Sequence, residues 1–152
     1  MKTEIKRTNS SNADFISLVA ELDAALKIID GDDHGFYDQF NKIDNIKNVV
    51  VLYENGSPLA CGAFKPHNDN QVEIKRMYSQ PAARGKGLAS KVLLELENWA
   101  AELNFKRCVL ETGERQIEAL ALYNKNGYKI IPNYGQYVGI KNSVCFGKNL
   151  LN

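Results

Sequence analysis

A glycine-rich turn in the middle of the chain has the residues needed to bind a phosphate group. It reads Gln80-Pro81-Ala82-Ala83-Arg84-Gly85-Lys86-Gly87-Leu88-Ala89-Ser90 and runs directly into an expected helix. Glycines let successive backbone N–H groups converge on an anion, and the unpaired amides and dipole of the first helical turn strengthen the attraction. The turn therefore predicts a phosphate or pyrophosphate site, with a loop whose glycines only satisfy turn geometry as the alternative.

Two widespread phosphate-binding patterns do not fit this turn. A Walker-type loop has four residues between its glycines followed by Gly-Lys-Ser/Thr, whereas Lys86 lies between two glycines. A dinucleotide fingerprint placed on Gly85, Gly87 and Ser90 lacks its third glycine, and its first glycine lies too far beyond the preceding strand. Neither an ATP-type loop nor a dinucleotide site is therefore favoured.

The elements before the turn are a helix and a hairpin. Apolar residues at helical spacing predict an amphipathic helix from Ser11 or Asn12 to about Ile29, with Ser11 and Asp14 as a capping box. Two β-rich runs, 49–53 and 59–64, flank a compact turn and predict a β-hairpin.

The rest of the chain alternates between strand and helix. We expect a short helix over 36–43, strands over 72–79, 107–111, 128–131 and 143–146, and longer helices over 87–103 and 116–126. The strand, helix, strand succession from 72 to 111 requires a parallel pair joined by a right-handed crossover, whereas the hairpin before it is antiparallel. The sequence therefore predicts a mixed α/β sheet with helices on its faces.

Composition excludes several classes of protein. The chain has 152 residues, 44% of them apolar and 24% charged, which suits one globular domain over 1–152 with a core of its own. A formal charge of +1 without runs of like charge argues against nucleic acid or an anionic membrane surface as partner. With no bilayer-length apolar stretch and no signal-peptide pattern at the start, we expect a cytoplasmic protein.

The three cysteines are expected to be reduced core residues. Cys61, Cys108 and Cys145 stand singly in apolar runs, without the density of a disulfide scaffold or the spacing of metal ligands. His34 and His67 lie in polar, turn-rich segments with no nucleophile or ligand spacing nearby. We therefore expect solvated histidines and no metal site.

The spacing Arg84-x-x-Gly87-x-Ala89 at the expected helix start gives the turn a more specific interpretation. It resembles the coenzyme A signature of the GNAT superfamily of acetyl-CoA-dependent N-acetyltransferases, which is Arg or Gln, two residues, Gly, one residue, then Gly or Ala. Downstream, Leu110–Gly113 and the run Gln116-x-x-Ala119-x-x-Leu122-Tyr123-x-x-x-Gly127-Tyr128 look like the family's other cofactor-side segment. Gln116 stands where the family usually has Asn. The motifs cover 72–128, and the upstream part is similar in its element order.

The resemblance implies a GNAT-like fold, an α/β (α+β) architecture with a mixed, mostly antiparallel central sheet, a splayed parallel strand pair and flanking helices. It also implies acetyl-CoA as cosubstrate, with no metal needed for direct transfer. The residues implied to bind the cofactor are Met77, Tyr78 and Ser79, which offer strand backbone to the pantetheine arm, Arg84, Gly85, Lys86, Gly87, Leu88, Ala89 and Ser90 around the pyrophosphate, and Gln116.

Acetyl transfer to an amine needs a neutral amine and a proton for the leaving thiolate. The resemblance makes Glu73 the candidate base and Tyr123 the candidate acid, since a phenol with a pKa near 10 is protonated at neutral pH. Glu73 is equally compatible with a solvated strand residue paired with a lysine, and Tyr123 with a core tyrosine. The family builds its acceptor-side wall where this chain has Asp30, Asp32, Asp33, Phe36, Tyr37, Gln39, Tyr134 and Tyr137.

The sequence thus predicts an N-acetyltransferase that moves acetyl from acetyl-CoA to a primary amine of a small molecule by direct attack in a ternary complex. Two alternatives stay open: a protein or peptide N-acetyltransferase, and a non-catalytic acyl-CoA-binding regulatory module. Homodimer formation is open as well.

Overall fold

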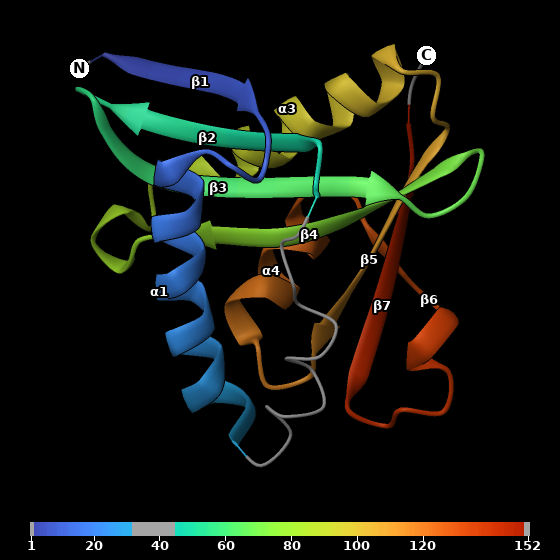
Figure 1. Ribbon diagram of the computed structural model, residues 1–152. Helices are drawn as coiled ribbons and strands as arrows, with labels where there is room; N and C mark the ends of the chain where they lie inside the picture. The colour runs from blue at the N-terminus through green and yellow to red at the C-terminus, as the bar shows by residue number, and fades with distance from the viewer. Residues whose placement is uncertain (1, 32–44, 151–152) are drawn as a thin grey trace.

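A seven-stranded sheet forms the centre of the computed structural model, which describes residues 2–31 and 45–150 (Figure 1). Its strands are β1 (Thr3–Thr8), β2 (Asn48–Glu54), β3 (Ser57–Pro66), β4 (Gln71–Ser79), β5 (Arg107–Gly113), β6 (Lys129–Ile131) and β7 (Ser143–Asn149). They lie in the order β1-β2-β3-β4-β5-β7-β6, and every neighbouring pair is antiparallel except β4 and β5. The predicted mixed, mostly antiparallel sheet is confirmed.

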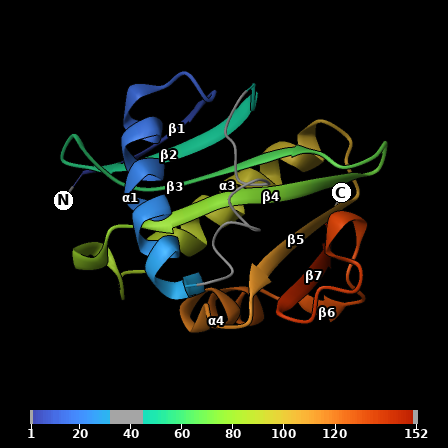
Figure 2. The ribbon, with the colours of Figure 1, turned by 60° about the horizontal axis from the view of Figure 1, so that its bottom comes forward.

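Helices cover both faces of the sheet (Figures 1 and 2). Helix α1 (Ala13–Asp30) packs on one face, whereas α3 (Leu88–Glu102) and α4 (Ile117–Lys125) pack on the other. Each face has its own apolar cluster because alternate strand residues point to opposite sides, so that Val49 and Val51 face α1 while Val50 and Leu52 face α3. The short helix predicted over 36–43 lies outside the described residues, as do Asp32 and Asp33 of the acidic turn before it, whereas Asp30 is the last residue of α1.

The start of α1 differs from the predicted capping box. Asn12 is the N-cap, and its Oδ1 accepts a hydrogen bond of 2.9 Å from the backbone N–H of Phe15. Asp14 instead accepts a hydrogen bond of 2.7 Å from the Tyr53 hydroxyl. The Ser11–Asp14 capping box was therefore wrong, because Asn12 supplies the cap and Asp14 joins the helix to the sheet.

Strand β1 was not predicted from the sequence. Its six residues, Thr-Glu-Ile-Lys-Arg-Thr, contain one aliphatic side chain and are largely exposed, so they have no apolar alternation to detect. Antiparallel pairing with β2 sets the strand, from Thr3 opposite Glu54 to Thr8 opposite Val49. Arg7 anchors it to α3 through ion pairs with Glu95 at 2.6 Å and Glu102 at 2.8 Å.

A β-bulge interrupts β4 next to the predicted cofactor strand. Cys61 pairs with Tyr78 and Ala63 with Lys75, so that one residue of β3, Gly62, stands opposite two residues of β4. Arg76, the first of these two, has a left-handed φ of 60°. In a regular strand, the side chains of Lys75 and Arg76 would point to opposite faces of the sheet. The bulge breaks this alternation at Arg76.

The Gly62→Ala variant is expected to be less stable than the wild type by about 1–3 kcal/mol. A Cβ on Gly62 would overlap Met77 Sδ and lie 2.9 Å from Leu96 Cδ1, so the bulge and α3 leave no room for it. Denaturant unfolding measures the loss. The same change made in a Met77→Ala background should cost less, and equal costs in both backgrounds would show that Met77 does not confine the glycine.

The two parallel strands stay together for only three residue pairs. Gln71 pairs with Arg107, Val72 with Cys108 and Glu73 with Val109, after which β4 continues along β3 and β5 along β7. Figure 1 shows the two strands diverging beyond that point. The pairing between β4 and β5 thus ends at Glu73, and the sheet opens at its centre between these two strands.

The cysteines are buried, and all three are free thiols, as predicted. Burial raises the pKa of the Cys61 and Cys108 thiols to about 12, so both stay protonated at neutral pH. Within 2–31 and 45–150, no three His, Cys, Asp or Glu side chains gather in a way that could hold a metal ion. In the same residues, no helix has the length and apolar character to cross a membrane.

Candidate active site

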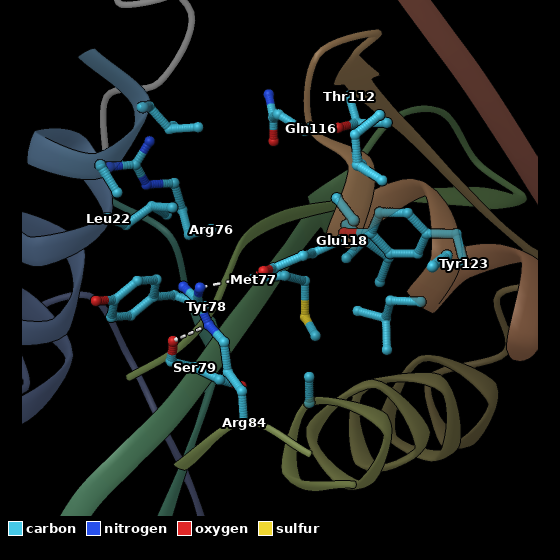
Figure 3. A pocket seen from close by; sticks show the side chains of 18 of the residues that line it. Leu22, Arg76, Met77, Tyr78, Ser79, Arg84, Thr112, Gln116, Glu118 and Tyr123 are labelled. Carbon is cyan, nitrogen blue, oxygen red and sulfur yellow. Dashed lines mark hydrogen bonds and ion pairs between the residues drawn. The ribbon is translucent and has the colours of Figure 1, made fainter. Parts of the chain in front are cut away.

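A cleft of about 880 Å³ opens where β4 and β5 diverge. Its walls come from α1 on one side and from β5 and α4 on the other, with β4 between them and the glycine-rich turn at one end (Figure 3). All of the predicted cofactor and catalytic residues except Lys86 line it: Glu73, Met77, Tyr78, Ser79, Arg84, Gly85, Gly87, Leu88, Ala89, Ser90, Gln116 and Tyr123. The fold thus gathers into one cleft residues that lie up to fifty positions apart.

Lys86 lies differently from the other residues of the turn. Its side chain is half exposed, and Nζ lies 3.9 Å from Oε1 of Glu54 on β2. The side chain is therefore directed toward β2, while the main chain of Lys86 stays between Gly85 and Gly87. Any contact of Lys86 with a ligand in the cleft would thus come from its backbone N–H.

The turn and the start of α3 form the predicted anion-binding end of the cleft. Gly85 and Gly87 have positive φ angles of 84° and 76°, a conformation in which a side chain would be strained. Gly87 is the N-cap of α3 and has no side chain to cap the helix, so the first backbone amides of α3 are available to a ligand. A Cβ at either glycine would meet no atom within 4 Å, which shows open space in front of the amides.

Arg84 crosses the cleft beside this anion-binding end. Its Nε donates a hydrogen bond of 3.2 Å to the Ser79 carbonyl, and its Nη1 forms an ion pair of 2.9 Å with Glu118 in the first turn of α4 (Figure 3). The guanidinium also lies 6.0 Å from the centre of the Tyr78 ring. Arg84 thereby joins the turn to the far wall and places a positive charge next to the amides of α3.

The cleft lining contains two buried hydroxyl groups that need hydrogen-bond partners. Ser79 Oγ and Thr112 Oγ1 are buried and have no hydrogen-bond partner in the described part of the chain. They lie on the diverging ends of β4 and β5, both in the lining of the cleft. A buried hydroxyl without a partner is costly, and an amide-containing arm lying between the two strands would supply partners for both.

The side chain of Tyr78 contacts α1, and the resemblance implies only its strand backbone for the pantetheine arm. Its hydroxyl donates a hydrogen bond of 3.2 Å to Glu21 on α1, and burial raises its pKa. Gln80 Nε2 contacts the same carboxylate at 3.1 Å. These side chains fasten α1 to the end of β4, which leaves the main chain of Tyr78 to contact a ligand.

Tyr123 extends from α4 into the cleft (Figure 3). Its ring packs in the core, with ring centres 5.7 Å from Tyr128 and 5.8 Å from Phe146, and the residue is only 6% exposed. Burial, together with the charge of Glu111, raises the pKa of the Tyr123 hydroxyl above its ordinary value of 10.0. The ring is thus a core side chain, and its hydroxyl keeps its proton throughout the neutral range.

Glu73 lies where β4 and β5 separate and is buried rather than solvated. Its Oε2 accepts a hydrogen bond of 2.7 Å from the Tyr134 hydroxyl, and its Oε1 lies 3.8 Å from Lys75 Nζ. Lys75 is buried too, and this burial lowers its pKa although Glu73 opposes the shift. The predicted pairing with a lysine exists, but at a fixed position in the cleft wall and not on the surface.

Some lining residues were missed in the sequence. Leu22, Leu26 and Ile29 belong to the apolar face that predicts α1, and all three line the cleft, with Ile29 39% exposed. Arg76 and Arg115 also line it. Periodicity identifies an apolar helix face without showing what covers it, and the bulge that places Arg76 has no marker in the sequence.

Stability is expected to fall steeply above pH 10. Burial raises the pKa of four tyrosines, Tyr123, Tyr128, Tyr134 and Tyr137, above their unfolded value. Above pH 10 the unfolded chain loses these protons while the folded chain keeps them, so the stabilisation that is complete below pH 10 declines as pH rises. Each such tyrosine lowers the free energy of unfolding by up to about 1.36 kcal/mol per pH unit.

Denaturant unfolding at pH 9, 10 and 11 measures this slope. The Tyr128→Phe variant should be less stable than the wild type at pH 8. Its free energy of unfolding should fall less steeply with pH, by up to about 1.36 kcal/mol per pH unit, because one titrating tyrosine is missing. A free energy of unfolding that does not change between pH 9 and 11 would contradict the prediction.

The curated relatives that this chain is similar to match about half of its length. YjgM of Escherichia coli, named an uncharacterized N-acetyltransferase, is 42% identical over 85 residues, which are 54% of this chain and 50% of that protein. The IAA acetyltransferase of Azospirillum brasilense is 33% identical over 89 residues, 58% of each chain. The chain therefore spans about half the length of the curated relatives it matches.

Solved structures match over nearly the whole chain. A Klebsiella pneumoniae protein assigned to the acyl-CoA N-acyltransferases is 28% identical, with a TM-score of 0.83 over 98% of both chains. The PaiA N-acetyltransferase of Thermoplasma acidophilum, solved in complex with coenzyme A, has a TM-score of 0.73 over 98% of this chain and 99% of its own. At 17% identity, the second similarity shows a shared fold.

The sequence model described as the acetyltransferase (GNAT) family matches residues 16–128. This range is well over half of the chain, and it begins upstream of the glycine-rich motif, in the first helix. The chain therefore belongs to the GNAT acetyltransferase family.

Proposed function

We propose that this chain is an N-acetyltransferase that transfers the acetyl group of acetyl-CoA to a primary amine of a small molecule, by direct attack in a ternary complex. The observation that carries the proposal is one continuous cleft that runs from the uncapped start of α3 to the buried side chains of Tyr123 and Glu73. An anion site at the start of α3, the proton donor Tyr123 and the carboxylate of Glu73 therefore line the same cleft and can act in the same acetyl transfer.

Each part of the cleft has its own task in holding the cosubstrate. The amides of 85–90 bind the pyrophosphate, with Arg84 beside them, and the diverging strands admit the pantetheine arm between Ser79 and Thr112. When bound, acetyl-CoA supplies an activated acyl group as a thioester. The coenzyme A in the Thermoplasma structure of the same fold supports this assignment.

Proton movements are assigned to two side chains. Glu73, held in place by Tyr134 and Lys75, accepts the proton of the attacking amine directly or through a water molecule. Tyr123 donates its proton to the departing thiolate, because its hydroxyl stays protonated in the cleft. A backbone N–H at the bulge, where β4 departs from regular pairing, polarises the thioester carbonyl.

A thiol-release screen with acetyl-CoA tests the proposal. The acceptors are polyamines, amino acids, aminoglycosides, amino sugars and short peptides, and release should require both the acceptor and the cleft. Release with peptides alone would favour a protein or peptide N-acetyltransferase. Tight binding of coenzyme A without release by any amine would favour a non-catalytic acyl-CoA-binding module.

The Gly87→Asp variant is expected to lose the stabilisation that coenzyme A gives to the wild type. Coenzyme A at a hundred times its dissociation constant should add about 2.7 kcal/mol of apparent stability, whereas NAD or ATP should add far less. The aspartate would place a negative charge in front of the α3 amides, at the end of the cleft where the pyrophosphate is expected.

A thermal-shift assay measures the effect, with Gly56→Asp as its matched control. Gly56 also has a positive φ, 84°, and open space around its Cβ position, but it lies in the turn between β2 and β3. Both variants strain the backbone alike, so only Gly87→Asp should lose the coenzyme A shift. Equal shifts in the two variants, or a larger shift from NAD, would contradict the predicted site.

A further inference from the structure

Arg76 is a buried cation that the roles above do not use. Its side chain is only 2% exposed, yet it forms part of the cleft lining on the side of α1 (Figure 3). One Nη of Arg76 is ion-paired with Asp23 of α1, and Nε is buried with no hydrogen-bond partner in the described part of the chain. A guanidinium presents five N–H donors in a planar fork, and a donor left unpaired in a buried site costs free energy.

The backbone places Arg76 there at a cost. Its φ of 60° lies in the left-handed region, which a residue with a long side chain rarely adopts. This conformation belongs to the bulge, in which Arg76 and Met77 stand opposite Gly62. The bulge lies on the part of β4 that has separated from β5. A positive charge is thus fixed next to the strand along which the thioester is proposed to lie.

Two charge pairs involve this stretch of β4. Lys75 lies 3.8 Å from Glu73, and Arg76 is paired with Asp23. A polyamine would bring further positive charge close to the buried cations Lys75 and Arg76, which is unfavourable. An acceptor with one amine and one anionic group matches this arrangement, because its anion can take the unused donor of Arg76 while its amine faces Glu73.

Apolar side chains complete the same wall. Leu22, Ala25, Leu26 and Ile29, on successive turns of α1, line the cleft beside Arg76. They provide a surface for an apolar substituent and no additional hydrogen-bonding groups. We propose that the acceptor is an α-amino acid with an apolar side chain, whose carboxylate is bound by Arg76; this inference rests on the acetyl transfer proposed above.

Matched acceptors separate the carboxylate from the amine. Phenylalanine, phenylalaninamide and phenethylamine share the ring and the primary amine, and only the first carries a carboxylate. For the wild type, kcat/KM should be about ten- to a hundredfold higher for phenylalanine than for the other two, the usual worth of a charge-assisted hydrogen bond. The less basic amine of the amide would by itself favour the amide, so amine ionisation cannot explain this order.

Two variants change the site in opposite directions. Arg76→Met should reduce the preference for phenylalanine to less than about threefold. Asp23→Asn should lower KM for phenylalanine severalfold, because it removes the negative charge that neutralises Arg76 and repels the substrate carboxylate. Arg7→Met is the matched control, since Arg7 is ion-paired with Glu95 and Glu102 away from the cleft. A retained thermal shift with coenzyme A verifies that each variant is folded.

A binding measurement makes the inference independent of turnover. In the presence of coenzyme A, N-acetylphenylalanine should raise the Tm of the wild type but not of Arg76→Met, and N-acetylphenylalaninamide should raise neither. If this pattern is seen without any thiol release, the carboxylate site stands and the proposed transfer fails. Equal kcat/KM for the three acceptors, or a preference that survives in Arg76→Met, would overturn the inference while leaving acetyl transfer in place.

Discussion

The Tyr123→Phe variant is expected to turn over acetyl-CoA about ten- to a thousandfold more slowly than the wild type, at or below the usual worth of a positioned proton donor. The phenylalanine ring keeps the packing against Tyr128 and Phe146 and removes only the hydroxyl. Affinity for coenzyme A should therefore hardly change. Single-turnover thiol release with a confirmed acceptor measures the loss.

The pH profile gives this prediction a second readout. Because burial raises the pKa of Tyr123 above 10.0, the hydroxyl carries its proton at every pH below that value. Ionisation of Tyr123 should therefore cause no loss of rate between pH 8 and 10, and the acidic form should be lost only above that range. A decline of the wild-type rate that begins below pH 9 and is absent in Tyr123→Phe would contradict the buried environment described here.

Tyr128→Phe is the control for Tyr123. Tyr128 is buried as well and contacts the Tyr123 ring, but its hydroxyl donates a hydrogen bond of 2.8 Å to Glu97, away from the cleft. Its loss should lower stability without slowing turnover. If the two variants have the same near-normal turnover, Tyr123 is a packing residue only.

The Glu73→Gln variant is expected to lose turnover about a hundred- to ten-thousandfold near neutral pH, the usual range for a positioned general base. Glutamine keeps the size of the side chain but cannot accept the proton of the attacking amine. Raising the pH should partly restore the rate, because a larger share of the amine is then neutral without help. Turnover against pH at saturating acceptor, for the wild type and the variant, measures both effects.

Glu97→Gln is an unusually close control for this change. Glu97 is also a buried glutamate that accepts a hydrogen bond from a tyrosine, Tyr128, and contacts a lysine, Lys148, at 2.9 Å. It lies on α3 and does not line the cleft. Both variants should lose stability, but only Glu73→Gln should lose turnover. Parallel pH profiles of similar height for Glu73→Gln and the wild type would show that the amine loses its proton to bulk water.

Local signals predicted the elements that surround the cleft. Strand β4, the turn and α3 were each found to within a residue or two, because hydrophobic period and glycine positions are local properties. Helical spacing predicts a buried face of α3 made of Leu88, Ala89, Val92, Leu93, Leu96, Ala100 and Leu103, and Leu88, Val92, Leu93, Leu96 and Ala100 are buried. The exceptions were Ala89, which lines the cleft, and Leu103, which is 48% exposed at the end of the helix.

Strand β1 and the start of α1 show where local signals fail. Strand β1 is an edge strand with polar and charged residues, and only its pairing with β2 makes it a strand. At the start of α1, Ser11, Asn12 and Asp14 are all capping residue types, and their sequence does not rank them. The Tyr53 hydroxyl, which lies close only after folding, binds Asp14 and leaves the cap to Asn12.

The sequence by itself determined the order of the strands from β2 onward, the parallel crossover and the glycine-rich start of α3, because each depends on residues close together in the chain. Only the tertiary structure decided how the side chains in the cleft are paired. Glu73 is held by Tyr134, sixty-one positions away, and Arg76 by Asp23, fifty-three positions away. Such pairs form where the three residue pairs between β4 and β5 end and where a bulge shifts the register between β3 and β4. Both features are consequences of how the strands pack against one another rather than of any local pattern.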